Sequence, residues 1–570
     1  MSEDSLSPAS ESAAPTSSAP SGQTAAQLFA RCLENENVEY VFGIPGEETL
    51  DVNEALEESP SIRFIPVRHE ESAAFMADAY GRYTHRPGVC LSTLGPGATN
   101  LTTGIADAYL DRAPMVALTG QIGLAGMHKE THQFIDVVEM IKPMTKWNVS
   151  IHDPRIIPEA VRKAFALAQA EKPGATHLEL PADVLALPAR GKPLAKPATA
   201  PSEPAPESLE LAAELLQTAR RPVLLVGNGV VRQGAARELR RFCERTGLHA
   251  ITTFMGKGAI DADDPHHLFT AGLRAQDYPQ GLLGRVDLVV CVGYDLVEWS
   301  PASWNPDGNL AIIAIDTAPI DIDAHYVPEV ELIGDISAIL AQLGDMLVGH
   351  EPALYEVPPY REAFAAVLDV GSDDDSPVKP QRVLHDLRRV MGRHDLLISD
   401  VGAHKLWIAR FWQANEPNTV WMSNGFAAMG FALPAAISAS LAAARRHKVV
   451  AVTGDGGFLM SAHELETARR LGVPMVCIVW RDGAYGLIEL HQQRKFGHVM
   501  GTRFDNPDFV ALAKAFGVEG MRVTRAGDLI PTLERALKVP GPVVVDVPVD
   551  YEENAKLGID LWRLAPRLAT

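Results

Sequence analysis

Short runs of apolar, mostly β-branched residues recur along this chain, and each is followed by a turn and then by a helical pattern. Examples are VEYVFGI and MVALTG in the first third, PVLLVGNG and LVVCVGYD in the middle, and KVVAVTG and MVCIVW in the last third. Strands that are apolar throughout are buried on both faces, which is typical of parallel sheets covered by helices. The predicted fold class is therefore α/β, with three consecutive parallel-sheet domains.

Two segments without apolar periodicity divide the chain. Residues 189–206 are rich in Pro and Ala, and residues 349–375 end in the acidic run 373–375. Both compositions indicate linkers. The expected domains are 23–188, 207–348 and 376–565, each of ordinary domain size. Residues 1–22 are mostly small and polar, which predicts a disordered tail.

Composition excludes several classes of partner. The net charge of −21 argues against a nucleic-acid partner and against an anionic membrane surface. The five cysteines show no CxxC spacing, and an odd number cannot form a complete disulfide framework. The N-terminal segment lacks the basic start and apolar run of a signal peptide, and no stretch approaches the roughly 18 apolar residues of a membrane span. We therefore expect a cytoplasmic protein.

Two carboxylates follow neighbouring strands in the last third. Asp455 lies in the sequence GDGG directly after KVVAV, and Asp482 follows the next strand 27 positions later, about one strand–helix–strand unit. Glycines allow a phosphate to approach the backbone, but an Asp there repels a diphosphate unless a divalent cation lies between them. GDGG alone is also consistent with a surface turn. Together, the two residues predict a Mg²⁺ site that holds a diphosphate at the sheet edge.

These motifs resemble the signature of thiamine-diphosphate enzymes, and further motifs occur in the order found in acetolactate synthases. They are VRHEESAA at 67–74, STLGPGATN at 92–100, DVGAHKLW at 400–407 and SNGFAAMG at 423–430. The resemblance covers nearly the whole chain outside the tail and linkers. It implies a pyrimidine-binding first domain and a diphosphate-binding third domain, which flank a Rossmann-like central domain.

The resemblance implies that Glu70 is the catalytic acid. The carboxyl group would bond N1′ of the cofactor's aminopyrimidine and favour the imino form that removes the proton from thiazolium C2. Glu71 is the neighbouring candidate, but the RHE order of the family favours Glu70. From the residues alone, a carboxylate here can also simply stabilise a helix N-terminus.

The remaining site residues also follow from the resemblance. Met429, which could otherwise be core filling, would support the bent cofactor, and the Ala427 carbonyl and the Met429 N–H would bond the pyrimidine. The carbonyl of Ala484 would be the third protein ligand of the metal. The implied cofactor-binding set is Gly402, Ala403, His404, Ala427, Met429, Gly454, Gly456 and Gly457. The implied substrate pocket contains Pro45, Gly46, Gln133, Leu487 and Ile488, with the acidic pair Glu47 and Glu48 near its mouth.

Details of the sequence resemble the FAD-independent type. Biosynthetic acetolactate synthases carry FAD and an Arg-Phe-Asp-Asp stretch in the central domain, whereas residues 292–298 here read VGYDLVE. Asp482 in place of Asn and the run THQ at 131–133 also resemble the catabolic form. The VGNGV sequence at 226–230 lacks a complete GxGxxG. We therefore expect no FAD and a central domain that acts as a structural spacer.

The implied reaction joins two pyruvate molecules into 2-acetolactate with release of CO₂, through an enamine formed on thiamine diphosphate. Glu70 and Asp455 would belong to different chains of a homodimer or homotetramer, and a regulatory subunit is possible but not indicated. Two alternatives stay open: another decarboxylase, oxidase or carboligase with this cofactor, and a non-catalytic cofactor-binding scaffold. The intact Glu70, Asp455 and Asp482 argue against the scaffold.

Overall fold

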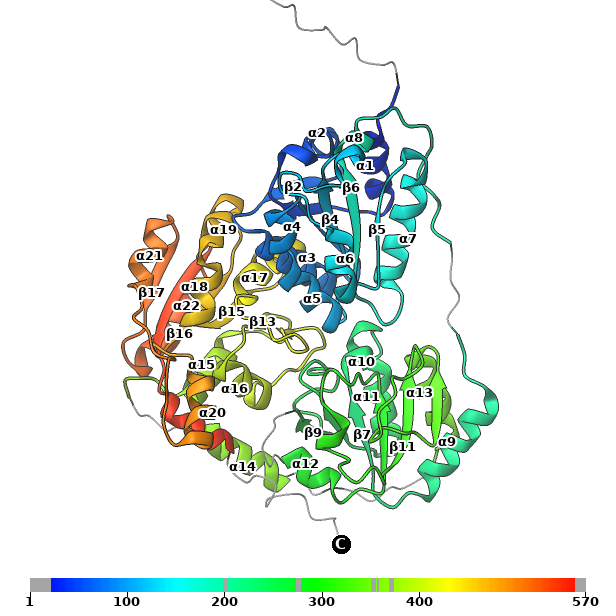
Figure 1. Cartoon of the computed structure of the whole chain (residues 1–570). Coiled ribbons are helices and arrows are strands. Elements are labelled where there is room, and N and C mark those ends of the chain that lie inside the picture. The colour runs from blue at the N-terminus through cyan, green and yellow to red at the C-terminus, as the bar shows by residue number, and fades with distance from the viewer. Residues whose placement is uncertain are drawn as a thin grey trace, which may run out of the picture.

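The computed structural model describes residues 22–197, 202–272, 278–349, 355, 358–368 and 374–558. Within these ranges the chain forms three sheets of six parallel strands, each covered by helices (Figure 1). The predicted α/β fold with three consecutive parallel-sheet domains is confirmed. The predicted tail, apart from Gly22, and parts of both predicted linkers lie outside the described residues.

The first sheet is built from apolar strands of the predicted kind, and β3, β4 and β6 are buried at every residue. In spatial order its strands are β2 (Arg63–Pro66), β1 (Tyr40–Gly43), β3 (Gly88–Ser92), β4 (Met115–Gln121), β6 (Ala175–Pro181) and β5 (Trp147–Ser150). Its helices are α1 (Ala25–Asn35), α2 (Leu50–Glu57), α3 (Glu70–Thr84), α4 (Pro96–Asn100), α5 (Thr102–Leu110), α6 (Val137–Ile141), α7 (Ile157–Gln169) and α8 (Ala182–Leu185).

The third sheet repeats the strand order of the first. In spatial order its strands are β14 (Val420–Met422), β13 (Leu396–Ser399), β15 (Val449–Gly454), β16 (Val476–Arg481), β18 (Val543–Pro548) and β17 (Glu519–Arg522). Its helices are α15 (Pro380–Val390), α16 (Ala403–Phe411), α17 (Ala432–Ala443), α18 (Asp455–Ser461), α19 (Leu465–Leu471), α20 (Gly486–Phe496), α21 (Phe509–Ala515) and α22 (Leu529–Ala536). Counted within each domain, both orders are 2-1-3-4-6-5. The direction of winding therefore reverses between β1 and β3 and between β13 and β15, where ligands bind in such sheets.

The central sheet has a different order, 3-2-1-4-5-6 counted within the domain, which is the Rossmann order. In spatial order its strands are β12 (Val330–Ile333), β11 (Ala311–Asp316), β10 (Leu288–Val292), β7 (Pro222–Val226), β8 (Ala250–Thr252) and β9 (His267–Thr270). Its helices are α9 (Pro206–Thr218), α10 (Asn228–Arg232), α11 (Ala236–Thr246), α12 (Tyr278–Leu283) and α13 (Ile336–Met346). A further helix, α14 (Pro358–Leu368), lies inside the predicted second linker.

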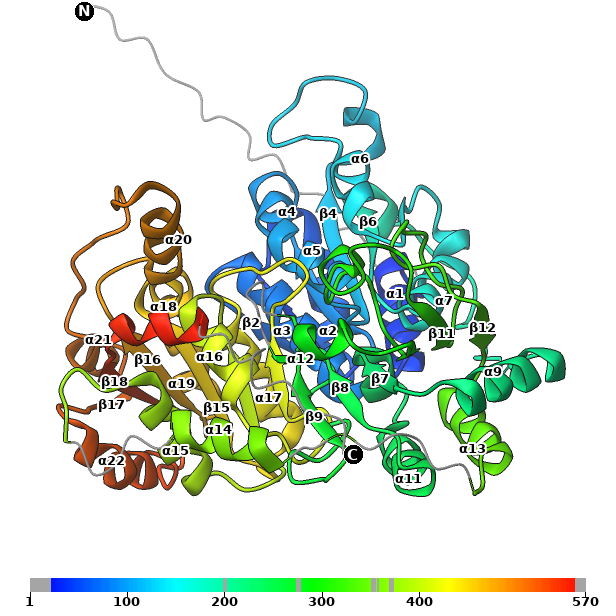
Figure 2. The same cartoon turned by 90° about the horizontal axis from the view of Figure 1, so that it is seen from below.

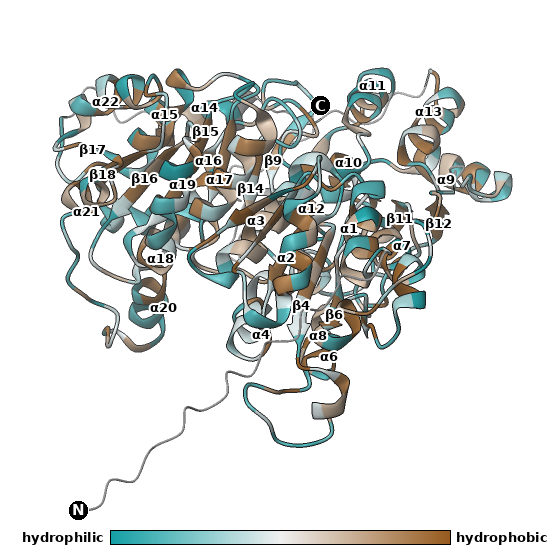
Figure 3. Cartoon of the chain, turned by 90° about the horizontal axis from the view of Figure 1, so that it is seen from above, coloured by the Kyte–Doolittle hydropathy of each residue, from teal (hydrophilic) through white to brown (hydrophobic). Residues whose placement is uncertain are grey.

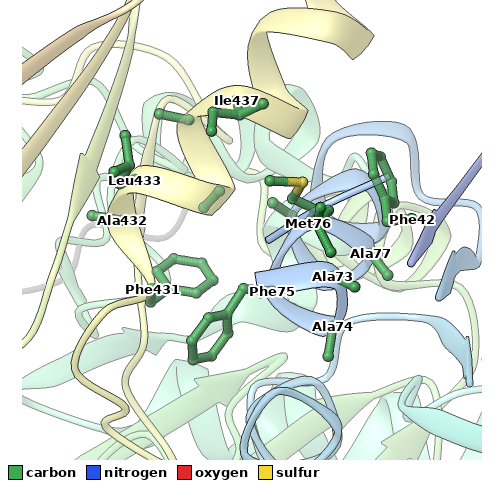
Figure 4. Close-up of a cluster of buried hydrophobic side chains, with 14 of the residues drawn as sticks. Phe42, Ala73, Ala74, Phe75, Met76, Ala77, Phe431, Ala432, Leu433 and Ile437 are labelled. Atoms are coloured by element: carbon green, nitrogen blue, oxygen red, sulfur yellow. The ribbon is translucent and has the colours of Figure 1, made fainter. Parts of the chain in front are cut away.

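Helices α3 and α17 join the first and third domains. Each helix follows the second strand of its own sheet, so the two are equivalent in topology. Phe75 of α3 meets Phe431 edge to face, with ring centroids 5.6 Å apart, and the Ser438 hydroxyl donates to the Met76 carbonyl at 2.6 Å. Figure 4 shows these side chains with the alanines of α3, whose small size permits close approach. One apolar core is therefore shared by both domains.

A buried charge cluster lies at the same junction. The Arg82 guanidinium on α3 contacts Asp78 (3.0 Å), Asp107 (3.2 Å) and Asp111 (3.0 Å), and it also donates to the Met422 carbonyl of β14 at 3.0 Å. Burial raises the pKa of Asp107 well above its usual value, and the neighbouring carboxylates add to this shift. Three carboxylates that are buried away from water need a positive charge beside them, which the Arg82 guanidinium supplies. Because the same group also bonds to β14, Arg82 fixes the position of β14 relative to the first domain.

The surface of the molecule follows the ordinary pattern. Apolar residues concentrate in the strands and on the inner faces of the helices, whereas the outer faces are polar (Figure 3). All five cysteines are buried and none forms a disulfide. In the part of the chain that the structure describes, no helix is both long enough and apolar enough to cross a membrane.

Candidate active site

Asp455 and Asp482 lie side by side at the carboxyl edge of the third sheet. Strands β15 and β16 are adjacent and parallel, with Gly454 in register with Trp480. Oδ2 of Asp455 accepts the N–H of Asp482 at 3.0 Å and that of Gly483 at 2.7 Å. Burial, together with the charge of Asp455, raises the pKa of Asp482 to about 7. Two carboxylates this close favour a proton or a cation between them.

Asn506 adds a further oxygen that the sequence did not reveal. Its amide nitrogen donates to Oδ2 of Asp455 at 2.7 Å, and its Oδ1 is buried without a hydrogen-bond partner. Ala484 forms an isolated bridge with Arg503, which holds the loop after β16 in place. Among the described residues, no group of three or more His, Cys, Asp or Glu side chains has metal-binding geometry. The two carboxylates and the Asn506 carboxamide nevertheless offer oxygen ligands of the kind that Mg²⁺ binds together with substrate phosphates.

A glycine-lined cradle lies where the third sheet reverses its winding. Gly402 precedes α16 with φ of +154°, and a Cβ at this position would lie 2.8 Å from Cε1 of His404. A Cβ at Gly454 would lie 3.4 Å from the same atom. His404 is 2% exposed, and its Nε2 has no hydrogen-bond partner among the described residues. Burial lowers the pKa of His404 to about 3, so the ring is neutral. A buried nitrogen without a partner fits a ligand that carries hydrogen-bonding oxygens.

Ala403 and the glycines of α18 complete this cradle. Ala403 is the first residue of α16, and Gly456 and Gly457 are the second and third residues of α18. A Cβ at Gly456 would lie 2.8 Å from the Tyr485 ring, and one at Gly457 would lie 3.2 Å from the Asp400 carboxyl carbon. The backbone at these positions is therefore packed closely on both sides. The Gly456 N–H donates to Oδ1 of Asp455 at 2.8 Å, which ties the start of α18 to this carboxylate. The starts of both helices direct their positive dipole ends toward the cradle.

The segment that bears Ala427 and Met429 is held from the third domain by Asp400. This buried carboxylate accepts the N–H of Gly430 at 3.0 Å and the Thr453 hydroxyl at 3.2 Å. Burial raises the pKa of Asp400 to about 6. Ala427 has a positive φ of 58°, and Met429 is half-buried. Asp400 thus joins the Met429 segment to β15. Sequence reasoning assigned it no role, although it follows a strand at the same sheet edge.

The first domain holds the other end of this segment. The Asp111 carboxylate accepts the N–H of Asn424 at 2.8 Å and that of Gly425 at 2.5 Å. The Ser423 hydroxyl donates to Asp107. The charge cluster around Arg82 therefore extends directly to the segment that carries Ala427 and Met429.

Glu70 is the first residue of α3, at the carboxyl edge of the first sheet. Its carboxylate is 9% exposed and accepts the side-chain N–H of Asn100 at 3.0 Å. A Cβ at Gly97 would lie 3.4 Å from its Oε1, so the side chain faces the loop after β3. Glu71 is half-buried, and a hydrogen bond to Thr103 partly offsets the rise in its pKa caused by burial. The two neighbouring glutamates therefore have separate surroundings.

Pro45, Gly46 and Gln133 gather near the same edge. A Cβ at Gly46 would clash with the side chain of Thr93, whose hydroxyl donates to Glu48 at 2.7 Å. Gln133 has a positive φ of 57°, and its carbonyl would lie 2.8 Å from a Cβ at Gly95. These residues surround the reversal point between β1 and β3, as Gly402 and Gly454 do between β13 and β15.

Leu487 and Ile488 lie on α20, a helix without a buried residue. Ile488 is 49% exposed. Figure 2 shows α20 standing out from the body of the third domain. A cavity of about 1040 Å³ lies beside α20 and is lined by Asp482, Ala484 and Glu489, but neither Leu487 nor Ile488 lines it. These two side chains are therefore free to contact a neighbouring surface.

Within one chain the two edges are not bonded to each other. Among the described residues, no hydrogen bond or ion pair joins Glu70 to the cradle residues. The carboxylate of Glu464 instead accepts the N–H groups of Arg68 at 2.9 Å and His69 at 3.1 Å. The start of α3 thus lies against the segment that follows α18. Asp455 and Asp482 lie together at one edge, and Glu70 lies at the other, with no polar contact between Glu70 and Asp455 among the described residues.

Comparison with known proteins gives the family. Three family models match: thiamine pyrophosphate enzyme N-terminal TPP binding domain at 23–140, central domain at 209–343 and C-terminal TPP binding domain at 400–547. The chain is 38% identical over 547 residues to an acetolactate synthase of Bacillus subtilis. The alignment covers 94% of this chain and 95% of that protein. The chain belongs to the acetolactate synthase family.

Other acetolactate synthases are similarly close. Identity is 37% to a catabolic acetolactate synthase of Raoultella terrigena, over 93% of this chain and 96% of that protein. Identity to an acetolactate synthase large subunit of Corynebacterium glutamicum is 34%, over 95% of this chain and 89% of that protein. Both edges described above lie within matched TPP-binding domains, and TPP is thiamine diphosphate. This acetolactate synthase family member is therefore a thiamine-diphosphate enzyme, as its sequence motifs predict.

We predict that Asp482→Ala weakens Mg²⁺-dependent retention of thiamine diphosphate by roughly tenfold or more. Substitutions of residues that only support metal ligands already lower metal affinity by about 10- to 100-fold, and loss of a ligand should cost at least as much. Asp482→Asn is the matched control, because a carboxamide oxygen can still bind a hard cation. Retention is measured by equilibrium dialysis with and without a chelator. Equal retention by wild type and Asp482→Ala in Mg²⁺ would exclude Asp482 from the metal shell.

Proposed function

We propose that this protein condenses two pyruvate molecules into 2-acetolactate with release of CO₂. The observation that carries the proposal is the paired Asp455 and Asp482 carboxylates beside the unpartnered Nε2 of His404, at the winding reversal of a TPP-binding domain. When bound, thiamine diphosphate supplies the carbon nucleophile that adds to a 2-oxo acid. The names of the relatives indicate acetolactate as the product.

Asp455, Asp482 and the carbonyl of Ala484 would hold Mg²⁺ in this proposal. Gly402, Ala403 and His404 would bind the diphosphate from one side, and Gly454, Gly456 and Gly457 from the other. The neutral ring of His404 can donate its Nε2–H to a phosphate oxygen without the cost of burying an imidazolium. The Asp455 carboxylate would lie close to the diphosphate only because the cation screens their repulsion.

Ala427 and Met429 would position the pyrimidine. The positive φ of Ala427 turns the backbone sharply before Met429, and Asp400 fixes the segment one residue later. The Ala427 carbonyl would accept a hydrogen bond and the Met429 N–H would donate one. A segment bonded from both the first and third domains has little freedom, which suits it to hold a ring in one orientation.

Glu70 would hold a proton at N1′ of the pyrimidine. Its near-complete burial keeps competing water away, and Asn100 fixes one of its carboxylate oxygens at 3.0 Å. The other oxygen is then free for the cofactor. Pro45, Gly46, Gln133, Leu487 and Ile488 would shape the acceptor pocket, where the Thr93 hydroxyl restrains Glu48.

The active form would be a homodimer or larger assembly in which a second copy supplies Glu70. Three exposed apolar side chains support this: Phe426 (43% exposed) beside Ala427, and Leu459 (39%) and Met460 (43%) on α18. A Cβ at Gly430 would lie 3.3 Å from Cβ of Met460, so α18 and the Met429 segment form one surface. An apolar surface beside a cofactor cradle is best explained by a partner that covers it.

We also infer that the central domain takes no flavin. The Glu298 carboxylate accepts the N–H of Asn228 at 3.0 Å, at the turn after β7. The Gly229 N–H donates to the Gly293 carbonyl at 2.8 Å, so the turns after β7 and β10 touch. Dinucleotides bind between these two turns in Rossmann sheets. Here this protein's own backbone and a carboxylate occupy that crevice, which supports a structural role.

Incubation of the purified protein with pyruvate, thiamine diphosphate and Mg²⁺ tests the reaction. We expect one 2-acetolactate and one CO₂ for every two pyruvates consumed, and no flavin absorbance in the purified protein. Products are identified by mass spectrometry. Acetaldehyde as the main product would indicate a decarboxylase, flavin with hydrogen peroxide would indicate an oxidase, and no turnover would favour a scaffold.

Glu70→Gln tests the proton role. Because glutamine cannot exchange a proton with N1′, we expect C2–H/D exchange of bound thiamine diphosphate to slow by about 100-fold or more, with cofactor affinity nearly unchanged. Exchange is followed by NMR after acid quench. Glu71→Gln is the matched control, since it removes the adjacent carboxylate and should leave exchange close to wild type. Unchanged exchange in Glu70→Gln would remove Glu70 from the proton pathway.

Mixed dimers test the shared site. Glu70→Gln and Asp455→Ala are each expected to be inactive alone. When the two variants are mixed and allowed to exchange subunits, a mixed dimer has one site with both defects and one intact site. Random pairing should then restore roughly a quarter of wild-type activity. If Glu70 and Asp455 of one chain served the same site, the mixture would remain inactive.

A further inference from the structure

A second cavity, of about 250 Å³, lies between the central and third domains, away from both sheet edges described above. Its walls come from the central domain near β8 and β9, from α14 and from the C-terminal end of α16. Figure 1 shows β9 and α14 below α16. Its described lining residues include Lys257, His267, Arg361 and Arg410 but no Asp or Glu. The titratable groups that the structure describes in this lining are therefore all basic.

Lys257 is 6% exposed, and none of the described residues provides a counter-ion for it. Its ammonium donates to the Thr270 hydroxyl at 3.0 Å and to the Ala409 carbonyl at 3.0 Å. Among the described residues, no carboxylate lies within ion-pair distance of it. An ammonium that leaves water is normally accompanied by an anion, because two neutral acceptors replace only part of its hydration.

Arg361 strengthens the positive field from the opposite wall. Its guanidinium donates to the carbonyls of Ala262, at 3.1 Å, and Asp264, and it likewise forms no ion pair within the described ranges. His267 is buried in β9, and its pKa is lowered to about 3 by burial and by the charges of Lys257 and Arg361. His267 therefore stays neutral and can serve as a hydrogen-bonding group.

Aromatic rings form the remaining wall. Phe364 of α14 stacks on Phe269 with centroids 4.5 Å apart and contacts Phe411 at 4.8 Å. The cavity has room for about eight water molecules. A site lined by both cations and apolar rings fits a small anion with a short apolar part.

We propose that this cavity is a binding site for a small anion, a carboxylate or a phosphate, held by Lys257 and Arg361. Helix capping by Lys257 explains its bond to Ala409 at the end of α16. Capping does not explain a second cation without a carboxylate partner among the described residues, in a lining whose described members include no Asp or Glu. α16 connects the cavity to the cofactor cradle, because its first residues are Ala403 and His404 and its last is Phe411.

Isothermal titration calorimetry on the full-length protein, saturated with thiamine diphosphate and Mg²⁺, tests the proposal. Inorganic phosphate and butyrate, a carboxylate that is not a 2-oxo acid, are the two probes. We expect saturable binding of at least one probe, with one site per chain. Binding of phosphate alone identifies a phosphate site, butyrate alone identifies a carboxylate site, and both identify a general anion site. Saturable binding of neither probe overturns the proposal.

Three variants separate anion binding from structural capping. Lys257→Gln keeps a donor for Thr270 and Ala409 but removes the charge, and Arg361→Gln does the same on the other wall. Each should weaken anion binding about 10- to 100-fold with little change in melting temperature. Lys146→Gln is the matched control, because Lys146 also donates to two backbone carbonyls but lies outside the cavity. Wild-type affinity in both cavity variants would exclude the site.

Proton uptake gives an independent readout. Burial lowers the pKa of Lys257 to about 7, so at pH 8 most of this amine is neutral. A bound anion favours the ammonium, so binding at pH 8 should take up a proton, whereas binding at pH 6 should not. The other titratable groups that face the cavity are the guanidinium groups of Arg361 and Arg410 and the ring of His267, whose pKa is lowered to about 3 and which therefore stays neutral in this range. Calorimetry in buffers of different ionisation enthalpy measures the uptake, and binding without it at pH 8 would rule out Lys257 as the contact.

Discussion

The buried guanidinium of Arg82 is the interaction on which the arrangement of the first and third domains depends. Three aspartates surround it, and two of them extend to the segment that leads to Ala427 and Met429. The position of that segment is therefore tied to the first domain as firmly as to its own. Buried ion clusters add little net stability compared with apolar packing, but they allow only one relative placement of the groups they join. For a cofactor site, placement matters more than stability.

The repeated strand order explains why the two edges of the site look alike. In both terminal domains, a strand that contains glycine lies where the direction of winding reverses. The helix that follows the second strand of each sheet packs against the other terminal domain. Glu70 begins α3, and Gly430 precedes α17 at the equivalent place. The Met429 segment and the start of α3 at Glu70 are thus two versions of one topological position. The central domain has another order, and its turns after β7 and β10 are hydrogen-bonded to each other.

The fold could be predicted from the sequence because the strand signal is local and repeated. Continuous apolar runs such as KVVAV and MVCIV specify buried parallel strands, and the 27-residue interval between Asp455 and Asp482 then fixes their adjacency. Asn506 reaches Asp455 from a loop with no periodicity, so its position depends on the folded chain. Asp400 and the Arg82 cluster depend on contacts between domains that no short pattern encodes. Helix α14 went unpredicted because its surroundings have the composition of a linker.

The proposal that Glu70 and Asp455 of one chain serve different sites has a consequence for handling the protein. Under the proposed pairing, catalysis requires association, so specific activity falls when the protein is diluted below the dissociation constant of the pair. The surface that would be covered is apolar, with Phe426, Leu459 and Met460 exposed. Association driven by apolar burial weakens on cooling. A dilute, chilled solution would then lose activity while every chain stays folded, and warming or concentrating the solution would restore it.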